Sequence, residues 1–98
     1  MKTISIQAED GLDKKFDRNL IIDGLNNSDI NYEVYEDQSD INFYIDTDNI
    51  QATWKAIKDN IISIDSVAKS CVVVCQGESG WDDIVFLHDN DDISKKGH

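Results

Sequence analysis

The stretch from Asp29 to Asp46, DINYEVYEDQSDINFYID, decides the fold because it alternates apolar and polar residues twice around a short polar break. The apolar positions are Ile30, Tyr32 and Val34 in the first half and Ile41, Phe43 and Ile45 in the second. Successive side chains of a strand point to opposite faces, so each alternation predicts a half-buried strand. Residues 37–39 supply a polar turn. The stretch therefore predicts a β-hairpin with one apolar face and one polar face.

A helix is predicted on each side of this hairpin. Upstream, residues 10–25 carry apolar residues at helical spacing, and Gly24 with the following asparagines closes the segment. Downstream, Asp48–Gln51 resembles a capping box with Asp48 as the N-cap, followed by a second apolar stripe. The two stripes consist of Leu12, Phe16, Leu20, Ile21 and Leu25, and of Ile50, Trp54, Ile57 and Ile61.

Three further strands are predicted toward the ends of the chain. Residues 2–8 alternate, which is typical of a half-buried strand. The run Cys71–Cys75 is apolar at every position, as expected of a central strand covered on both faces. After a turn at Gly77–Gly80, residues 81–88 form a last strand. The two cysteines are too far apart along one strand to form a disulfide, so we expect buried thiols.

The predicted order is strand, helix, strand, strand, helix, strand, strand. Its first six elements match the ferredoxin-like split βαβ arrangement, an α+β fold in which both helices cover one face of an antiparallel sheet. The fifth strand would extend that sheet by a hairpin. We expect residues 1–89 to form one compact domain and residues 90–98 to form a polar C-terminal tail. The other face of the sheet would be free.

Negative charge dominates two parts of the chain. The protein has 9 Lys and Arg against 20 Asp and Glu, a formal net charge of −11. Asn19–Trp54 and Ser70–Ser94 contain no Lys or Arg but hold fourteen of the carboxylates. Such a field repels nucleic acid and anionic membranes and attracts cationic partners. The composition therefore argues for a basic protein partner and against direct contact with nucleic acid or membrane.

Two groups of residues are candidates for partner binding. The first is the polar face of the hairpin, where tyrosines alternate with acids and an amide: Glu33, Tyr35, Asn42, Tyr44 and Asp46. Tyrosine is enriched at protein interfaces, and carboxylates suit Lys or Arg on a partner. The second is Trp81, Asp82 and Asp83, next to the glycine-containing turn. The competing interpretations are an ordinary solvated sheet face and a tryptophan packed at the start of a strand.

No catalytic, metal or cofactor motif is found. Asp46–Gln51 and Asp89–Ser94 both fail the EF-hand spacing at positions five and six. Gly77–Gly80 is too short for a phosphate-binding loop, and His88 is the only histidine within the predicted domain. We therefore expect a non-enzyme without metal or cofactor.

The sequence also predicts where the protein is found. Acids at Glu9 and Asp10 precede any signal-peptide core, and no apolar run could span a bilayer, which predicts a cytoplasmic protein.

These observations favour a protein-binding inhibitor. Our leading hypothesis is a small immunity protein, or antitoxin, that neutralises a cationic toxin such as a nuclease, whose active site must hold phosphate. One alternative is a nucleic-acid mimic that blocks a restriction or CRISPR protein, with carboxylates spaced like phosphates along an elongated surface. Another is a regulatory domain that binds a metabolite between subunits, which rests on fold analogy alone.

Overall fold

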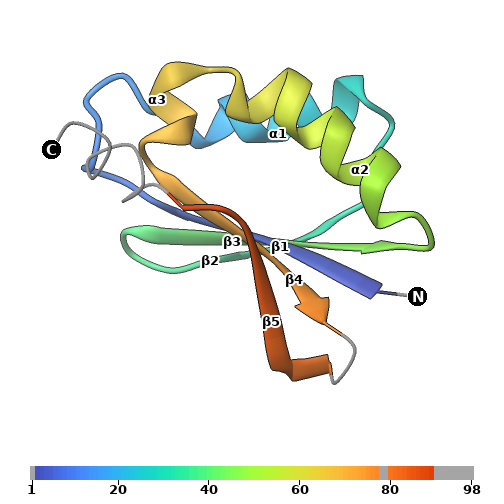
Figure 1. Ribbon diagram of the computed structural model, residues 1–98. Helices are drawn as coiled ribbons and strands as arrows, with labels where there is room; N and C mark the ends of the chain where they lie inside the picture. The colour runs from blue at the N-terminus through green and yellow to red at the C-terminus, as the bar shows by residue number, and fades with distance from the viewer. Residues whose placement is uncertain (1, 78–79, 90–98) are drawn as a thin grey trace, which may run out of the picture.

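Five antiparallel strands form a single sheet, and the helices lie on one side of it (Figure 1). The structure, a computed structural model, describes residues 2–77 and 80–89, without the side chains of residues 80–83. The strands are β1 (Lys2–Glu9), β2 (Glu33–Glu36), β3 (Asp40–Thr47), β4 (Cys71–Gly77) and β5 (Gly80–His88). Their order across the sheet is β2-β3-β1-β4-β5, so β1 is central and β2 and β5 are the edges.

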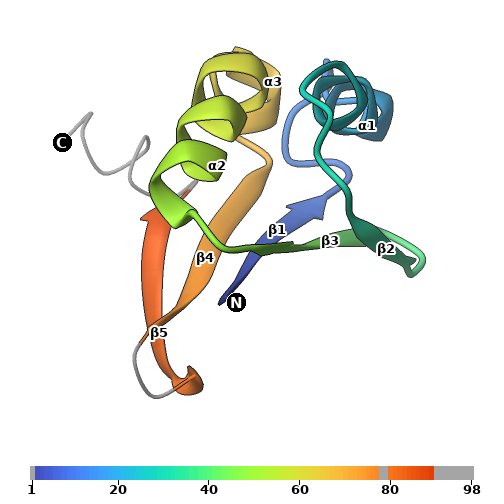
Figure 2. The ribbon, with the colours of Figure 1, turned by 90° about the vertical axis from the view of Figure 1, so that its right-hand side faces the viewer.

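The helical layer covers one face of this sheet. It consists of α1 (Arg18–Asn27), α2 (Ile50–Ile57), the π-helical turn η1 (Lys58–Ile62) and the short α3 (Asp65–Ala68). Figure 2 shows α1 on the side of β2 and β3, and α2 with α3 above β4. The predicted α+β fold is therefore confirmed, with an antiparallel sheet and a layer of helices. Among the described residues, none of the helices has the length and apolar character needed to cross a lipid bilayer.

The core lies between the helices and the sheet. Antiparallel pairing places Ile4 opposite Ile45 and Ile6 opposite Phe43, so inward side chains of neighbouring strands meet. The buried cluster contains Ile4, Ile6, Ala8, Ile41, Phe43, Ile45, Cys71, Val73 and Cys75 from the strands and Ile21, Leu25, Ile57, Ile61 and Val67 from the helical layer. The inward face predicted for residues 41–45 is therefore correct. Both cysteines are buried and free, as expected.

The first helix begins eight residues later than predicted. Residues 10–17 form a turn-rich loop, in which Gly11 has a φ of +95° and Leu12 is 51% exposed. Asp17 is the N-cap, and its carboxylate accepts a hydrogen bond from the Asn19 N–H. The spacing of Leu12 from the later apolar residues is therefore coincidental. A good capping residue inside the apparent stripe sets the start of the helix.

The first hairpin strand is shorter than predicted. Only Glu33–Glu36 pair with β3, while Asp29 has a φ of +55° and the chain arrives from α1 in an irregular path. Tyr32 still packs on the core, its ring centroid 5.7 Å from that of Phe43 in an edge-to-face arrangement. Val34, expected inside, is 42% exposed because it lies on an edge strand. At α2 the N-cap is Asn49, one residue later than predicted.

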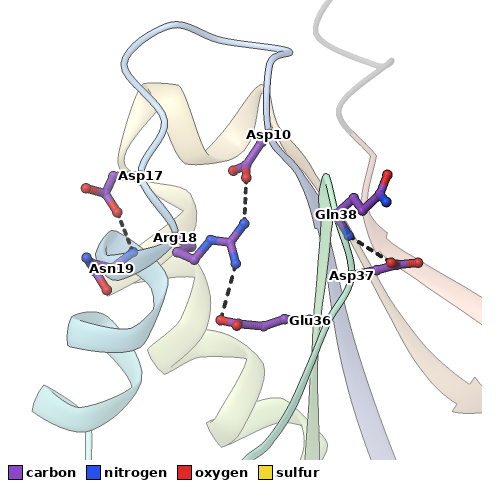
Figure 3. A network of polar contacts seen from close by, with 7 residues as sticks. All are labelled: Asp10, Asp17, Arg18, Asn19, Glu36, Asp37 and Gln38. Carbon is purple, nitrogen blue, oxygen red and sulfur yellow. Dashed lines mark hydrogen bonds and ion pairs between the residues drawn. The ribbon is translucent and has the colours of Figure 1, made fainter.

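Arg18 ties three parts of the molecule together. Figure 3 shows its guanidinium between Asp10, in the loop after β1, and Glu36, at the end of β2. The Arg18 Nη1 atom lies 3.2 Å from Glu36 Oε1. These carboxylates, Asp10 above all, raise the pKa of Arg18. The contact holds the exposed edge strand β2 against the start of α1.

Gly24 permits the close contact between α1 and η1, which predicts a measurable effect of a single methyl group. A Cβ atom there would lie 2.5 Å from Ile61 Cγ1 and 3.4 Å from the Asn60 carbonyl oxygen. Overpacking costs roughly 1–3 kcal/mol, against about 1 kcal/mol gained in helix propensity. We expect Gly24→Ala to lower the free energy of unfolding by about 1 kcal/mol in urea titrations. Asn26→Ala, on the exposed side of the same helix, is the control; a Gly24→Ala protein as stable as wild type would contradict this packing.

Candidate functional site

The face of the sheet away from the helices, which we call the open face, brings the hairpin candidates together. Register places Glu33 opposite Tyr44 and Tyr35 opposite Asn42, so these four residues share this face. Asp46 lies on it too, opposite Thr3 of β1. The sequence therefore predicted correctly which hairpin residues lie side by side on this face.

Two tyrosines form the aromatic centre of this surface. The rings of Tyr35 and Tyr44 meet edge to face, with centroids 5.4 Å apart and an interplanar angle of 73°. The Tyr35 hydroxyl donates a hydrogen bond of 3.2 Å to Glu33 Oε2, and this bond is the main cause that raises the Tyr35 pKa. The pair therefore forms a preorganised aromatic patch with a carboxylate at its border.

A hollow of about 570 Å³ lies beside this patch. It is lined by Thr3, Ser5, Gln7, Glu33, Tyr35, Tyr44, Val74 and Ile84. Its floor is Ser5, a fully buried small residue between Tyr44 on β3 and Val74 on β4. One wall is polar and aromatic, and the other, from β4 and β5, is apolar. The hollow thus suits a side chain with an aliphatic stem and a polar or charged end.

The charge of the open face is negative. Glu33 and Asp46 border the tyrosines, and Glu9 lies directly opposite Asp40 across the β1–β3 pair. Like charges in such a pair destabilise a sheet. In the described part of the chain, no open-face strand position carries Lys or Arg. The described bases are Lys2 at the start of β1, on the other face, and Lys14, Lys15, Arg18, Lys55, Lys58 and Lys69 in or beside the helical layer.

Half of this surface was not among the predicted site residues. Thr3, Ser5 and Gln7 on β1, with Val74 and Ile84 on β4 and β5, complete the hollow. The alternation of residues 2–8 was visible in the sequence and gave the correct face for the first three. Nothing in that alternation tells which strands become neighbours, so the hollow itself was not predicted.

The second predicted group, Trp81, Asp82 and Asp83, lies on β5. Their side chains fall outside the described residues, so the prediction for this group stays a prediction. The same holds for the polar tail predicted at residues 90–98.

The histidine and cysteine side chains of the described residues lie away from the open face, in polar contact or in the core. His88 Nε2 lies 2.7 Å from the Ala68 carbonyl oxygen. Burial raises the pKa of the Cys71 thiol to about 12, so the thiol is protonated at neutral pH. No set of three or more His, Cys, Asp or Glu side chains within residues 2–77 and 84–89 is arranged to hold a metal ion. What the open face offers chemically is recognition through aromatic, apolar and anionic groups.

No protein-family model, curated protein or solved structure matches this chain.

Proposed function

We propose that this chain is a protein-binding inhibitor whose open face holds a cationic protein, as an immunity protein holds a toxin such as a nuclease in the cytoplasm. One observation carries the proposal: Tyr35 and Tyr44 share an exposed sheet face with Glu33 and Asp46, and no described base lies on that face. Aromatic anchors bordered by uncompensated carboxylates are suited to a surface rich in Lys and Arg.

The hollow suggests how such a partner is held. A Lys or Arg side chain of the partner would lay its stem on Val74 and Ile84 and reach Glu33 with its charged end. There it would also lie over the face of one of the two tyrosine rings, where a cation is attracted by the ring electrons. The net charge of −11 would speed the approach of a basic protein at low salt.

We assign the fold, also as a proposal, to the ferredoxin-like split βαβ arrangement with an added strand. The order β2-β3-β1-β4 and the antiparallel pairing of β1 with both β3 and β4 support it. The strand β5 then continues the sheet beside β4.

The shape favours a compact docking patch over mimicry of nucleic acid. The principal extents are 35 × 31 × 26 Å, so the molecule is not elongated. A mimic needs carboxylates along an extended path, whereas here the open face combines a few carboxylates with tyrosines and an apolar wall.

The test begins with the genes on either side of the one that encodes this chain; a basic protein found there is purified and titrated with this chain in a calorimeter. We expect a complex that weakens as salt is added. Changing Tyr35 and Tyr44 to Ala should raise the dissociation constant by roughly tenfold for each ring, because buried interface tyrosines contribute about 1–2 kcal/mol or more.

Val34→Ala is the matched control, since Val34 lies between Glu33 and Tyr35 on β2 but points to the other face. Unchanged affinity in the double tyrosine variant, with circular dichroism showing an intact fold, would reject the open face as the docking site. If no basic protein is encoded there, or if the one found forms no complex with this chain, the immunity role is contradicted.

A further inference from the structure

One row of residues on the open face, which we call the cross-strand row, runs across all five strands. The registers of β2 with β3, β3 with β1 and β1 with β4 place its members directly opposite one another. The β4–β5 ladder, which is regular from Val74 to Gln76, adds the last member. At about 4.8 Å per strand the row is roughly 19 Å long. Its members, from β2 to β5, are Glu33, Tyr44, Ser5, Val74 and Phe86.

The two ends of the cross-strand row differ in chemistry. Glu33 gives one end a carboxylate, and Phe86, which is 65% exposed, gives the other end a phenyl ring. Ile84, two residues away on the same face of β5, is exposed as well. In the middle, the small Ser5 is fully buried and forms the floor of the hollow. Exposed apolar side chains that adjoin one another mark protein contacts, and a single Lys or Arg in the hollow would leave Phe86 uncovered.

The position of the row on a sheet face limits the kind of segment that can lie on it. An added strand forms hydrogen bonds with the edge of a sheet, whereas the face of a sheet offers side chains only. A segment that crosses the face must therefore satisfy its own backbone N–H and C=O groups, which a helix does. The cross-strand row thus suits a helix that lies across the strands.

We propose that the basic partner lays an amphipathic helix along the cross-strand row, with a Lys or Arg toward Glu33 and an apolar side chain on Phe86. The inference rests on the proposed function, because charge complementarity at Glu33 is what selects a cationic helix. From Ser5 to Phe86 is two strands, roughly 10 Å, and seven helical residues rise about 10.5 Å. A base in the hollow and an apolar residue about seven positions away, on the same side of the helix, therefore fit the row.

Substitutions on the two faces of β5 test the apolar end of the row. Phe86→Ser removes the proposed contact, whereas Val85→Ser changes a neighbouring residue, 46% exposed, that points to the other face. Calorimetry with the basic protein found among the neighbouring genes measures both variants at two salt concentrations. We expect Phe86→Ser to raise the dissociation constant by roughly tenfold at both concentrations, because the lost contact is uncharged. Val85→Ser should leave it unchanged.

A synthetic helix tests the occupant without the natural partner. The probe is an Ala- and Gln-rich peptide of about 20 residues, long enough to be helical in water, with Arg and Leu about seven positions apart. One control peptide places Arg and Leu on opposite sides of the helix, and the other carries a central proline, which breaks the helix. In NMR spectra of the isotope-labelled full chain, the amide signals of Ser5, Val74 and Phe86 should shift at several-fold lower concentrations of the probe than of either control.

The outcomes separate this inference from the proposed function. If the basic protein binds and Phe86→Ser has no more effect than Val85→Ser, the row is not the contact and the proposed function stands. If either control peptide binds as tightly as the probe, or if the probe shifts no signal along the row, the helix is wrong. If no basic protein is found or bound, the proposed function fails, and the peptide titration still decides whether the row binds a helix.

Discussion

Replacing Phe43 by Ala is expected to lower the free energy of unfolding by roughly 3–5 kcal/mol, as is usual for a fully buried phenylalanine. A domain of this size is stable by only about 5–15 kcal/mol, so the variant should be close to unfolding at physiological temperature. The cause is a cavity beneath the helices, together with loss of the edge-to-face contact with Tyr32. Urea titration followed by circular dichroism and tryptophan fluorescence measures the effect.

Tyr44→Ala is the matched control for this change. Tyr44 follows Phe43 on β3 but lies on the open face, where it is only half-buried. We expect a stability loss well below that of Phe43→Ala, and Phe43→Leu should recover most of the lost stability. If the two alanine variants lost equal stability, the assignment of Phe43 to the face under the helices and of Tyr44 to the open face would be wrong.

Reversing the charge of Glu33 is expected to have the largest effect on binding. In Glu33→Lys a cation would border the hollow where we propose that the partner's Lys or Arg is held. Like charges brought together at an interface cost several kcal/mol, so the dissociation constant should rise by on the order of 100-fold. Calorimetry with the basic partner at two salt concentrations measures it. Part of the loss should be recovered at high salt.

Asp23→Lys separates a local effect from a change in net charge. It alters the charge by the same amount, but Asp23 is an exposed residue of α1, in the helical layer. We expect a small decrease in association rate and little change in dissociation rate. Equal losses for Glu33→Lys and Asp23→Lys would show that only the overall charge matters and that the open face is not the contact surface.

The strands were largely predictable because burial on one face fixes the alternation of side chains. Ile41, Phe43 and Ile45 are all buried, and Cys71–Cys75 forms an interior strand with neighbours on both sides. The helix boundaries were harder, since Leu12 fits the helical spacing yet lies in a loop. There the capping chemistry of Asp17 and the left-handed Gly11 outweigh the periodicity.

In the candidate site, the hairpin residues could be predicted from the sequence, whereas the residues from β1, β4 and β5 that complete the hollow could not. Register within a hairpin follows from the local pattern, so Glu33, Tyr35, Asn42 and Tyr44 could be placed on one face. The contacts of β1 with β3 and β4 depend on the path of the whole chain through the helices. The apolar wall and the Ser5 floor of the hollow therefore emerge only in three dimensions.

The central position of β1 has a consequence for the order in which the protein can be assembled. Ile4 is paired with Ile45 on one side and Cys75 on the other, so β1 is synthesised before both of its partner strands and waits for them. Non-local pairing of this kind slows folding and leaves apolar strand surface exposed meanwhile. On the ribosome the hollow beside Tyr44 has no second wall until β4 has emerged. If the open face is the binding surface as proposed, a nascent chain would complete that surface only after β4 and β5 have been synthesised.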